Sequence, residues 1–439
     1  MRKVKLDQVF GVSTEQLSSY LVREKVDGLF LSALNSNKQI VVYGSSKQGK
    51  TALVTKYTPY DQNIKVSCSP KADIEDIYKS ILRQLGIEIS TSKVAKSGSR
   101  YNIGAVAKIK AILFPISGES SVKSDISATT EKSEEVVSVE FNLSLAQDIS
   151  ELIKVAVKGK FIILEDFHYL SSEVQKQLAF DLRTFQEMGI RFIVLGVWRE
   201  KNRLAQYNGD LLDRIIEVPV EPWLKEEFLE VIHKGEAALN IKFSYEVYDE
   251  LLANAFDSIG VVQELLRSVC EQSRISETQK ETKAINDQEL LKKAIRRKSA
   301  EYAARHVRAL EMIAEGRKPT STKNGLEPLC LPYYSVKAIL TIEFDSILRG
   351  IRRELLEAEI KKLHHRPADV RPGDMSNLLH NFALLQLEKD IRPPIFDYNR
   401  DSRVLKIIDS TFYFFMRNVN KTVILDNLIN PLETNGNGH

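Results

Sequence analysis

The chain has 439 residues, a length that suggests roughly two to four domains and is ample for a sizeable hydrophobic core. Apolar residues make up 43% and charged residues 28% of it, which is ordinary for a soluble globular protein. The formal net charge is only +3. This value argues against a strongly basic nucleic-acid binder, so any basic surface must be local.

Cysteine usage and the N-terminal residues indicate a cytoplasmic protein. Cys68, Cys270 and Cys330 form neither a CxxC pair nor a zinc-binding spacing, so we expect reduced thiols rather than disulfides or a cysteine metal site. The first residues lack the long apolar stretch of a signal peptide, and no run of about 18 apolar residues predicts a membrane span. We therefore expect no membrane among the partners.

The first part of the chain alternates between helix and strand patterns. Residues 16–35 carry apolar side chains at helical spacing, and residues 40–43 form a short apolar run that ends in a glycine-rich loop. A helix is then expected from Lys50 to about Tyr57, a strand over 64–67 and a helix over 73–85. This order predicts an α/β fold with a parallel sheet and helices on its faces.

Residues 88–145 interrupt the alternation. Residues 117–136 are rich in Ser, Thr, Lys and Glu, and apolar segments flank them at 103–114 and 136–143. We interpret this part as a β-hairpin with a flexible tip that is inserted into the core fold. A disordered insertion without function explains the composition equally well.

The core pattern resumes after the insertion and then gives way to helices. The expected elements are a helix over 149–157, a buried strand over 161–164, a helix over 173–187, a buried strand over 191–195 and a short strand over 215–218. From 223 to about 300 the periodicity is entirely helical.

Residues 44–51 read Gly-Ser-Ser-Lys-Gln-Gly-Lys-Thr and fit the phosphate-binding pattern GxxxxGK[ST], directly after an apolar strand. The backbone N–H groups of such a loop curl around phosphate oxygens, and the following helix N-terminus favours an anion. Lys50 can reach the β- and γ-phosphates, and the Thr51 hydroxyl can ligate Mg²⁺. The pattern predicts ATP bound with Mg²⁺. The expected nucleotide-binding residues are Gly44, Ser45, Ser46, Lys47, Gln48, Gly49, Lys50, Thr51 and Ala52.

A second constellation is the apolar run 161–164 followed by Glu165 and Asp166. Two carboxylates at the end of a buried strand form the Walker B pattern, in which one helps to hold Mg²⁺ and the other orients the attacking water. By position, Glu165 takes the Mg²⁺ role and Asp166 the water-polarising role. The usual order, Asp then Glu, is reversed, so slow hydrolysis is expected. For His168 a structural role is favoured over a supporting role in catalysis.

With these motifs in this order, the sequence resembles AAA+ ATPases of the initiator branch, which includes origin-recognition and replication-initiation ATPases. It is also similar to the related transposition-regulator and signal-transducing (STAND-type) ATPases. The resemblance spans about residues 15–300 and, more loosely, the C-terminal part. It implies that Arg23, within 22–26, contacts adenine. It also implies that Arg214 is an arginine finger that reaches a neighbour's γ-phosphate in a homo-oligomer. A salt-bridged structural role for Arg214 is equally open, and Arg203 is the second candidate finger.

Two departures from the family pattern favour a nucleotide-driven switch or assembly over a fast motor. Gln263 stands where the sensor-2 arginine is usual, and Arg267, one helical turn further on, is the candidate substitute. The strand before the finger is followed by Trp198 and Arg199 and offers no small polar sensor-1 residue. Arg199 can contact phosphate instead, whereas Trp198 is expected to be a packing residue.

The C-terminal part suggests a winged helix-turn-helix domain. Residues 292–308 form a basic helical stretch, and residues 334–366 are expected to form a helix, a turn near Gly350 and a second helix. Two apolar segments within 395–408 are joined by a hairpin turn and would form the wing. The basic residues of these segments are Lys292, Lys293, Arg296, Arg297, Lys298, Arg305, Arg308, Arg349, Arg352, Arg353, Lys361, Lys362, Arg400 and Arg403. Such a domain either binds double-stranded DNA or serves as a protein-interaction or autoinhibitory module.

The expected organisation is an ATPase core over 1–222 with the insertion 88–145, a helical lid over 223–300, a basic helix with a winged helix over 301–430, and a disordered tail over 431–439. The leading hypothesis is an ATP hydrolase, slow in turnover, that oligomerises in an ATP-dependent way and acts as a regulator or loader on DNA. The alternative is a signalling switch that controls a protein effector without binding DNA.

Overall fold

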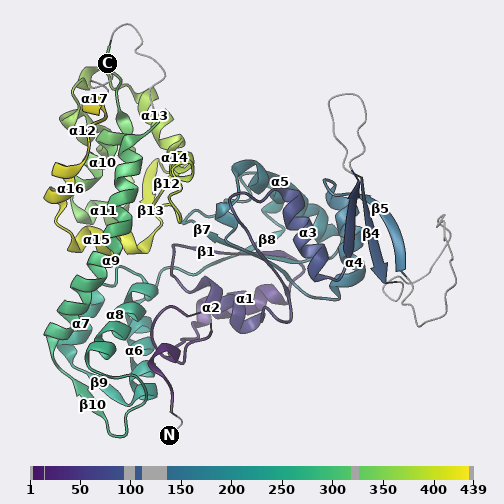
Figure 1. Cartoon of the computed structure of the whole chain (residues 1–439), viewed down its shortest axis with the longest axis horizontal. Coiled ribbons are helices and arrows are strands. Elements are labelled where there is room, and N and C mark those ends of the chain that lie inside the picture. The colour runs from purple at the N-terminus through teal and green to yellow at the C-terminus, as the bar shows by residue number, and fades with distance from the viewer. Residues whose placement is uncertain (1–2, 14, 93–103, 111–135, 318–325, 435–439) are drawn as a thin grey trace.

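A computed structural model describes residues 3–13, 15–92, 104–110, 136–317 and 326–434 (Figure 1). Its central sheet has the strand order β2-β6-β7-β1-β8, and every neighbouring pair is parallel. The strands are β1 (Gln39–Gly44), β2 (Ile64–Ser67), β6 (Ile162–Glu165), β7 (Phe192–Val197) and β8 (Ile215–Pro219). The parallel α/β sheet expected from the sequence is confirmed.

Helices cover both faces of this sheet, which is why its central strands are apolar throughout. One face packs on α3 (Ile74–Gln84), α4 (Ala146–Val157) and α5 (Ser172–Glu187), and the other on α1 (Glu24–Leu34) and α2 (Lys50–Tyr57). The helix predicted over 16–35 begins only at Glu24. The Asp27 carboxylate accepts the backbone N–H of Arg23 at 2.9 Å and so satisfies a free N–H at the helix start.

The insertion is a three-stranded antiparallel sheet that extends beyond α3 and α4 (Figure 1). It consists of β3 (Glu88–Ser92), β4 (Gly104–Lys110) and β5 (Val136–Asn142), in the order β3-β4-β5. The predicted hairpin is present as β4 and β5, whereas β3 was missed because its sequence is short and mostly polar. Most of the predicted flexible tip, 117–136, lies outside the described residues.

The lid consists of α6 (Lys225–Leu239), α7 (Tyr245–Ala253) and α8 (Ile259–Gln272), with one short parallel strand pair. That pair, β9 (Ile241–Phe243) with β10 (Lys283–Ile285), was not predicted. Leu6, Val9 and Phe10 from the N-terminal segment, which includes the 3-10 helix η1 (Leu6–Gln8), belong to the hydrophobic core of the lid. The chain therefore begins on the lid and only then enters the sheet.

A single helix, α9 (Gln288–Glu315), runs from the lid into the C-terminal part, so the expected border at 300 falls inside a helix. The C-terminal helices and strands enclose a hydrophobic core of their own. They are α10 (Leu331–Thr341), α11 (Phe344–Arg349), β11 (Ile351–Arg352), α12 (Arg353–Leu363), α13 (Pro372–His380), α14 (Phe382–Glu388), β12 (Phe396–Asn399), β13 (Val404–Ile407), α15 (Ser410–Asn418), α16 (Lys421–Asn427) and α17 (Pro431–Thr434).

Three C-terminal strands form an antiparallel sheet in the order β11-β13-β12. The hairpin expected within 395–408 is β12 and β13. The segment 334–366 contains three helices instead of two, because the chain leaves helical geometry at Ile342 and Glu343, between α10 and α11. The expected turn near Gly350 (φ 91°) ends α11 and leads into β11. A Cβ at Gly350 would lie 2.6 Å from Val404 Cγ1, so a side chain does not fit there. The tail expected to be disordered from 431 is helical at Pro431–Thr434.

Within the described ranges, none of the helices combines the length and the apolar character needed to cross a membrane.

Candidate nucleotide-binding site

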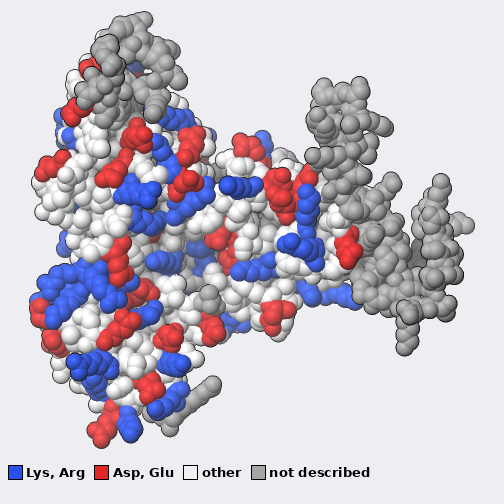
Figure 2. Space-filling view, viewed as in Figure 1, with Lys and Arg blue, Asp and Glu red and all other residues white. Residues whose placement is uncertain are grey.

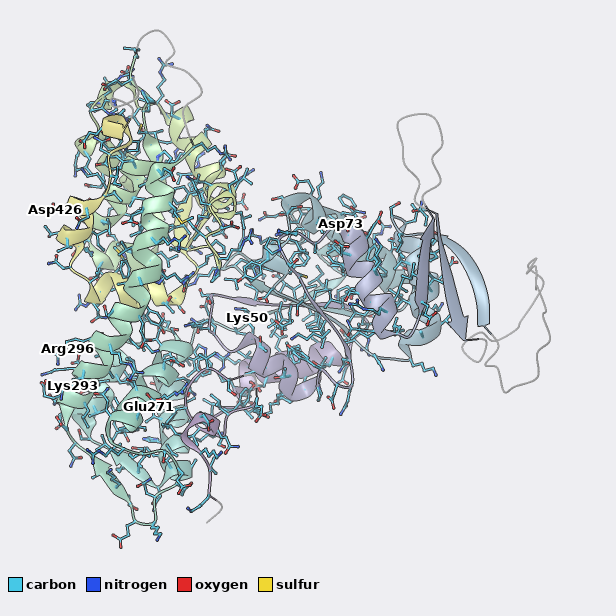
Figure 3. All side chains as sticks on the ribbon, in the orientation of Figure 1. Lys50, Asp73, Glu271, Lys293, Arg296 and Asp426 are labelled. Atoms are coloured by element: carbon cyan, nitrogen blue, oxygen red, sulfur yellow. The ribbon has the colours of Figure 1, made fainter. Side chains whose placement is uncertain are left out.

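A cavity of about 290 Å³ opens at the carboxyl edge of the central sheet, between the core and the lid. The N-terminal segment closes a third side. Lys50 lies there, at the centre of the molecule in Figure 3. Of the predicted nucleotide-binding residues, the cavity is lined by Arg23, Ser46, Lys47, Gln48, Gly49, Lys50, Thr51 and Ala52; Glu165 and Asp166 line it as well. Most of the residues along this wall of the cavity were therefore predicted from the sequence.

The loop between β1 and α2 has a backbone that requires glycine at both ends. Gly49 is left-handed (φ 85°) directly before α2, and Gly44 has φ 155°. A Cβ on Gly44 would lie 2.7 Å from Val220 Cγ2. The Lys50 ammonium donates to the carbonyl oxygens of Gly44 at 2.9 Å and Ser45 at 2.6 Å. Burial lowers the pKa of Lys50 to about 8, so an arriving phosphate would stabilise its charged form.

The two carboxylates stand at the end of β6, facing the start of α2. Thr51 Oγ1 lies 3.4 Å from Glu165 Oε1, and the Tyr60 hydroxyl donates to the same carboxylate oxygen. Burial, and next the negative charge of Asp166, raise the pKa of Glu165 to about 7; burial also raises the pKa of Asp166. Tyr60 was not predicted, because nothing in a loop residue 105 positions from Glu165 signals the contact.

A hydroxyl and a carboxylate at this spacing are the hard oxygen ligands that Mg²⁺ prefers, so the residues present fit the ion. Mg²⁺, when bound, would neutralise phosphate charge. Thr51 and Glu165 would hold it.

The strand order shows where the P-loop lies relative to the two carboxylates. Strand β7 lies between the P-loop strand β1 and the carboxylate strand β6, and a helical lid follows the last strand, β8. The cavity lies between this sheet and the lid. The chain has the fold of an AAA+ P-loop ATPase.

Comparisons with known proteins give only distant similarity. No protein-family model and no curated protein matches the sequence. Among solved structures, the Walker-type ATPase PABY2304 of Pyrococcus abyssi is 11% identical, with a TM-score of 0.48 over 92% of this chain and 97% of that one. The Aeropyrum pernix Orc1 protein in complex with DNA is 10% identical, with a TM-score of 0.43 over 99% and 98%. Cdc6p of Pyrobaculum aerophilum is 13% identical, with a TM-score of 0.32 over 92% and 93%. The fold assignment therefore rests on the strand order and the P-loop.

Arg23 lies on the far side of this AAA+ cavity from the carboxylates. Its guanidinium stacks on the Trp223 ring, 3.9 Å from the ring centroid, and donates to the Val220 carbonyl at 3.0 Å. Its Nη1 has no hydrogen-bond partner among the described residues. A flat cation over an aromatic ring makes this end suited to a planar base. Trp223 was missed, because only the folded chain brings it to Arg23.

Gln263, at the sensor-2 position, joins the lid to the N-terminal segment. Its amide accepts the Gly11 N–H at 3.3 Å and donates to Ser19 Oγ at 3.0 Å. Arg267 pairs with Glu271 at 3.1 Å on the lid surface and does not line the cavity. The structure therefore does not bring the candidate substitute for the sensor-2 arginine into the site.

The structure explains why the sensor-1 position, at Gly196, has no polar side chain. A Cβ on Gly196 would lie 1.5 Å from the Trp198 ring, so this ring occupies the space of any side chain at 196. Trp198 is fully buried against Tyr43 and Phe167, as expected for a packing residue. Arg199 donates to Ser45 Oγ at 2.6 Å and to Glu221 at 3.1 Å, so it reaches the P-loop.

The two candidate fingers lie in different surroundings. Arg214 precedes β8 at the amino edge of the sheet, opposite the P-loop, where it contacts Glu187 at 3.3 Å and is one-third exposed. Arg203 pairs with Asp397 of the C-terminal part at 3.1 Å and lies over the Trp198 ring. Both arginines therefore have a carboxylate partner within this chain, as the salt-bridged alternative for Arg214 expects, and Arg214 is the more exposed of the two.

The tip of the P-loop is held from outside the core. The Ser46 N–H donates to the Ile408 carbonyl at 3.0 Å, and Ser410 Oγ donates to the Ser46 carbonyl at 2.8 Å. On the lid side, the Gly260 N–H donates to the Lys47 carbonyl at 3.0 Å. Nothing in the sequence predicted these contacts, which join residues more than 200 positions apart.

Proposed function

We propose that this protein is an ATP-binding, slowly turning over ATPase whose nucleotide state controls the docking of its C-terminal domain, residues 316–434, and that this domain binds DNA when it is released. The observation that carries the proposal is the pair of hydrogen bonds between Ser46 of the P-loop and the segment Ile408–Ser410. A loop that closes around phosphate is thus also part of an interdomain contact.

Two cations connect phosphate binding to this docking. The Lys47 ammonium lies 4.9 Å from the centroid of the Tyr302 ring, which belongs to α9 and packs on Phe414 of the C-terminal domain. Arg199 lies 3.4 Å from the Tyr413 hydroxyl of that domain. Both cations also contact or belong to the P-loop. A nucleoside triphosphate brings several negative charges into this cavity and attracts both cations more strongly than an aromatic ring or a neutral phenol does. We therefore expect ATP to weaken the docking more than ADP does.

DNA binding is supported by a group of arginines around the C-terminal hairpin, one of which, Arg353, donates to the Pro372 carbonyl at 2.5 Å. We name Arg349, Arg352, Arg353, Arg400 and Arg403 the wing patch. β11 pairs with β13, and the Arg353 N–H donates to the Arg403 carbonyl at 3.0 Å, so three of the five are neighbours. Burial, and next the charges of Arg400 and Arg353, lower the pKa of His380. Within the described ranges none of the five has a carboxylate partner, so their charges are available for phosphates.

The basic stretch of α9 is less suited to DNA. Lys292 and Arg296 pair with Glu289, Arg297 and Lys298 with Glu301, and Arg305 with Asp409. Figure 3 labels Lys293 and Arg296 on α9, and in Figure 2 the blue cluster at this place is bordered by red side chains. Because five of the seven basic residues within 292–308 have acidic partners, α9 is a poor first choice for the DNA face.

Oligomerisation is part of the proposal through Arg214. Arg214 lies at the amino edge of the sheet, so it cannot reach the nucleotide cavity at the carboxyl edge of the same sheet. In an oligomer it would reach the nucleotide cavity of a neighbouring subunit. The shared site would make assembly depend on ATP.

The direct test is binding of a labelled duplex DNA, measured by fluorescence anisotropy without nucleotide, with ADP and with ATP. We expect tighter binding with ATP in the wild type and no effect of ATP in Lys50→Ala. Equal affinity under all three conditions in the wild type would refute nucleotide control.

A protein-effector switch is the second candidate, and one observation favours it. Part of the hairpin is already used within the chain: Asp397 pairs with Arg203, and Asn399 donates to Glu200 at 2.8 Å. A hairpin with acidic and amide groups on one side suits a protein surface. An ATP-dependent pull-down of one protein, with no DNA binding at low salt, would support this candidate.

A further inference from the structure

His168 is a buried histidine that lines the nucleotide cavity and has no hydrogen-bond partner. It lies in the 3-10 helix η3 (Phe167–Tyr169), one short turn after the carboxylates, and is 8% exposed. Both ring nitrogens are closed to solvent and lack a partner among the described residues, so a ligand in the cavity meets them only when the ring turns. A buried polar group without a partner is costly, so its position calls for a ligand.

The surroundings of His168 indicate which ligand this is. Lys50, the lysine expected to reach the β- and γ-phosphates, lines the same cavity as His168. Burial, and next the charges of Lys50 and Arg203, lower the pKa of His168 to about 3. The ring is therefore neutral at physiological pH, with one N–H that can be donated to an anion.

His168 also lies beside the end of β7, which offers no polar side chain to the cavity. Leu195, Gly196 and Val197 form the adjacent wall of the cavity at the end of β7, and Trp198 excludes any side chain at 196. The helix η3 packs directly on β7. The one polar side chain that η3 adds to this part of the cavity wall is His168.

We propose that His168 donates its ring N–H to the γ-phosphoryl group of the bound nucleotide, and so distinguishes a triphosphate from a diphosphate. This rests on the proposed function, because it presupposes a nucleotide on the P-loop. It gives the chain a γ-phosphate contact from the Walker B side, in place of a polar residue at the end of β7. No proton is transferred in this contact; the imidazole acts as a neutral donor.

The test compares the affinity of fluorescently labelled ADP with that of a slowly hydrolysed, labelled ATP analogue. The proteins are wild type, His168→Ala, His168→Asn and the control Tyr169→Phe. Tyr169 is the next residue and stacks near the His168 ring, with ring centroids 4.2 Å apart, but it does not line the cavity. His168→Asn keeps an N–H donor near the same place.

We expect His168→Ala to weaken binding of the ATP analogue roughly tenfold or more, the loss that accompanies removal of a hydrogen bond to a charged group. ADP affinity should change less than about twofold, His168→Asn should recover part of the loss, and Tyr169→Phe should bind like the wild type. An equal loss for ADP and the analogue, or no loss for either, would overturn the proposal. A wild type that binds neither nucleotide would instead refute the proposed function itself.

Discussion

The two ends of the P-loop differ in what they contact. At the helix end, Lys50 and Thr51 lie beside Glu165 and Asp166, all within the core. At the tip, Ser46 and Lys47 contact Ile408, Ser410, Tyr302 and the lid. The difference suggests two tasks for one short loop. In the proposed function, the helix end provides the chemistry of nucleotide binding, and the tip is the part through which occupancy would act on the C-terminal domain.

The largest expected effect is at the helix end. Lys50→Ala removes a buried cation for which phosphate is the natural partner, so we expect ATP and ADP affinity to fall roughly a hundredfold or more. Isothermal titration of both nucleotides measures this. Lys154→Ala, on the exposed surface of α4, is the control and should bind normally. Unchanged nucleotide affinity in Lys50→Ala would mean that this cavity is not the nucleotide-binding site.

The carboxylates come next. Asp166→Asn should keep ATP affinity within about threefold, but reduce phosphate release roughly a hundredfold, because a neutral amide cannot polarise the attacking water. Glu165→Gln should instead raise the Mg²⁺ concentration needed for half-maximal ATP binding. If Asp166→Asn hydrolyses ATP at the wild-type rate, the assignment of roles to the two carboxylates is wrong.

The wing patch and the α9 stretch can be compared directly. Replacing Arg400 and Arg403 by Ala should weaken duplex binding roughly tenfold at moderate salt and reduce the slope of log K against log[salt] by about two. The matched variant replaces Lys292 and Arg296, which already pair with Glu289, and should have a much smaller effect. If the α9 variant weakened DNA binding more than the wing-patch variant, the DNA-binding surface would be α9 and not the wing patch.

The contacts of the loop tip predict a smaller effect. Asp397→Asn removes the ion pair with Arg203, and Ser410→Ala removes the hydrogen bond to the Ser46 carbonyl. If docking competes with ATP, both variants should bind ATP a few-fold more tightly and DNA more tightly without nucleotide. Titration calorimetry and anisotropy measure the two quantities. Weaker ATP binding in both would mean that docking assists the nucleotide.

The smallest effect concerns pH. His306 of α9 is buried, bonds Thr411 at 2.9 Å and supports α15 behind the loop-tip contact. Burial lowers its pKa to about 4. Between pH 6.5 and 4 the unfolded chain binds a proton that the folded chain excludes, so the free energy of unfolding falls as pH falls, by at most about 1.4 kcal/mol per pH unit.

His306→Gln should therefore show a flatter dependence of thermal stability on pH across this window than the wild type does, even if it is less stable overall. Thermal unfolding at several pH values between 4 and 7 provides the comparison. Parallel curves for the two proteins would exclude His306 as a source of the slope.

The sequence predicted the parts of the fold and site that are local. A strand, the loop 44–51 and a helix are consecutive, and the carboxylates directly follow the three apolar residues of β6. The geometry of both motifs therefore follows from residues that are neighbours in the sequence. The polar strand β3 and the short pair β9-β10 were missed because their patterns are too short to distinguish from loops.

The remaining site contacts depend on how distant segments meet. Trp223 under Arg23, Arg199 on Ser45, and Ile408 on Ser46 each join parts of the chain that no motif links. The empty sensor-1 position was visible in the sequence, but its cause was not, because only the folded chain shows the Trp198 ring over Gly196.

Amide hydrogen exchange tests the central claim most directly, because it follows the loop and the C-terminal segment in one experiment. It would be measured on Asp166→Asn, in which bound ATP persists, without nucleotide, with ADP and with ATP, and on Lys50→Ala with ATP. We predict that ATP protects peptides covering 44–54 and, at the same time, increases exchange over 396–418, whereas ADP protects the loop with little effect on 396–418 and Lys50→Ala shows neither change. Protection of 44–54 by ATP with no change over 396–418 would contradict the coupling of nucleotide state to C-terminal docking.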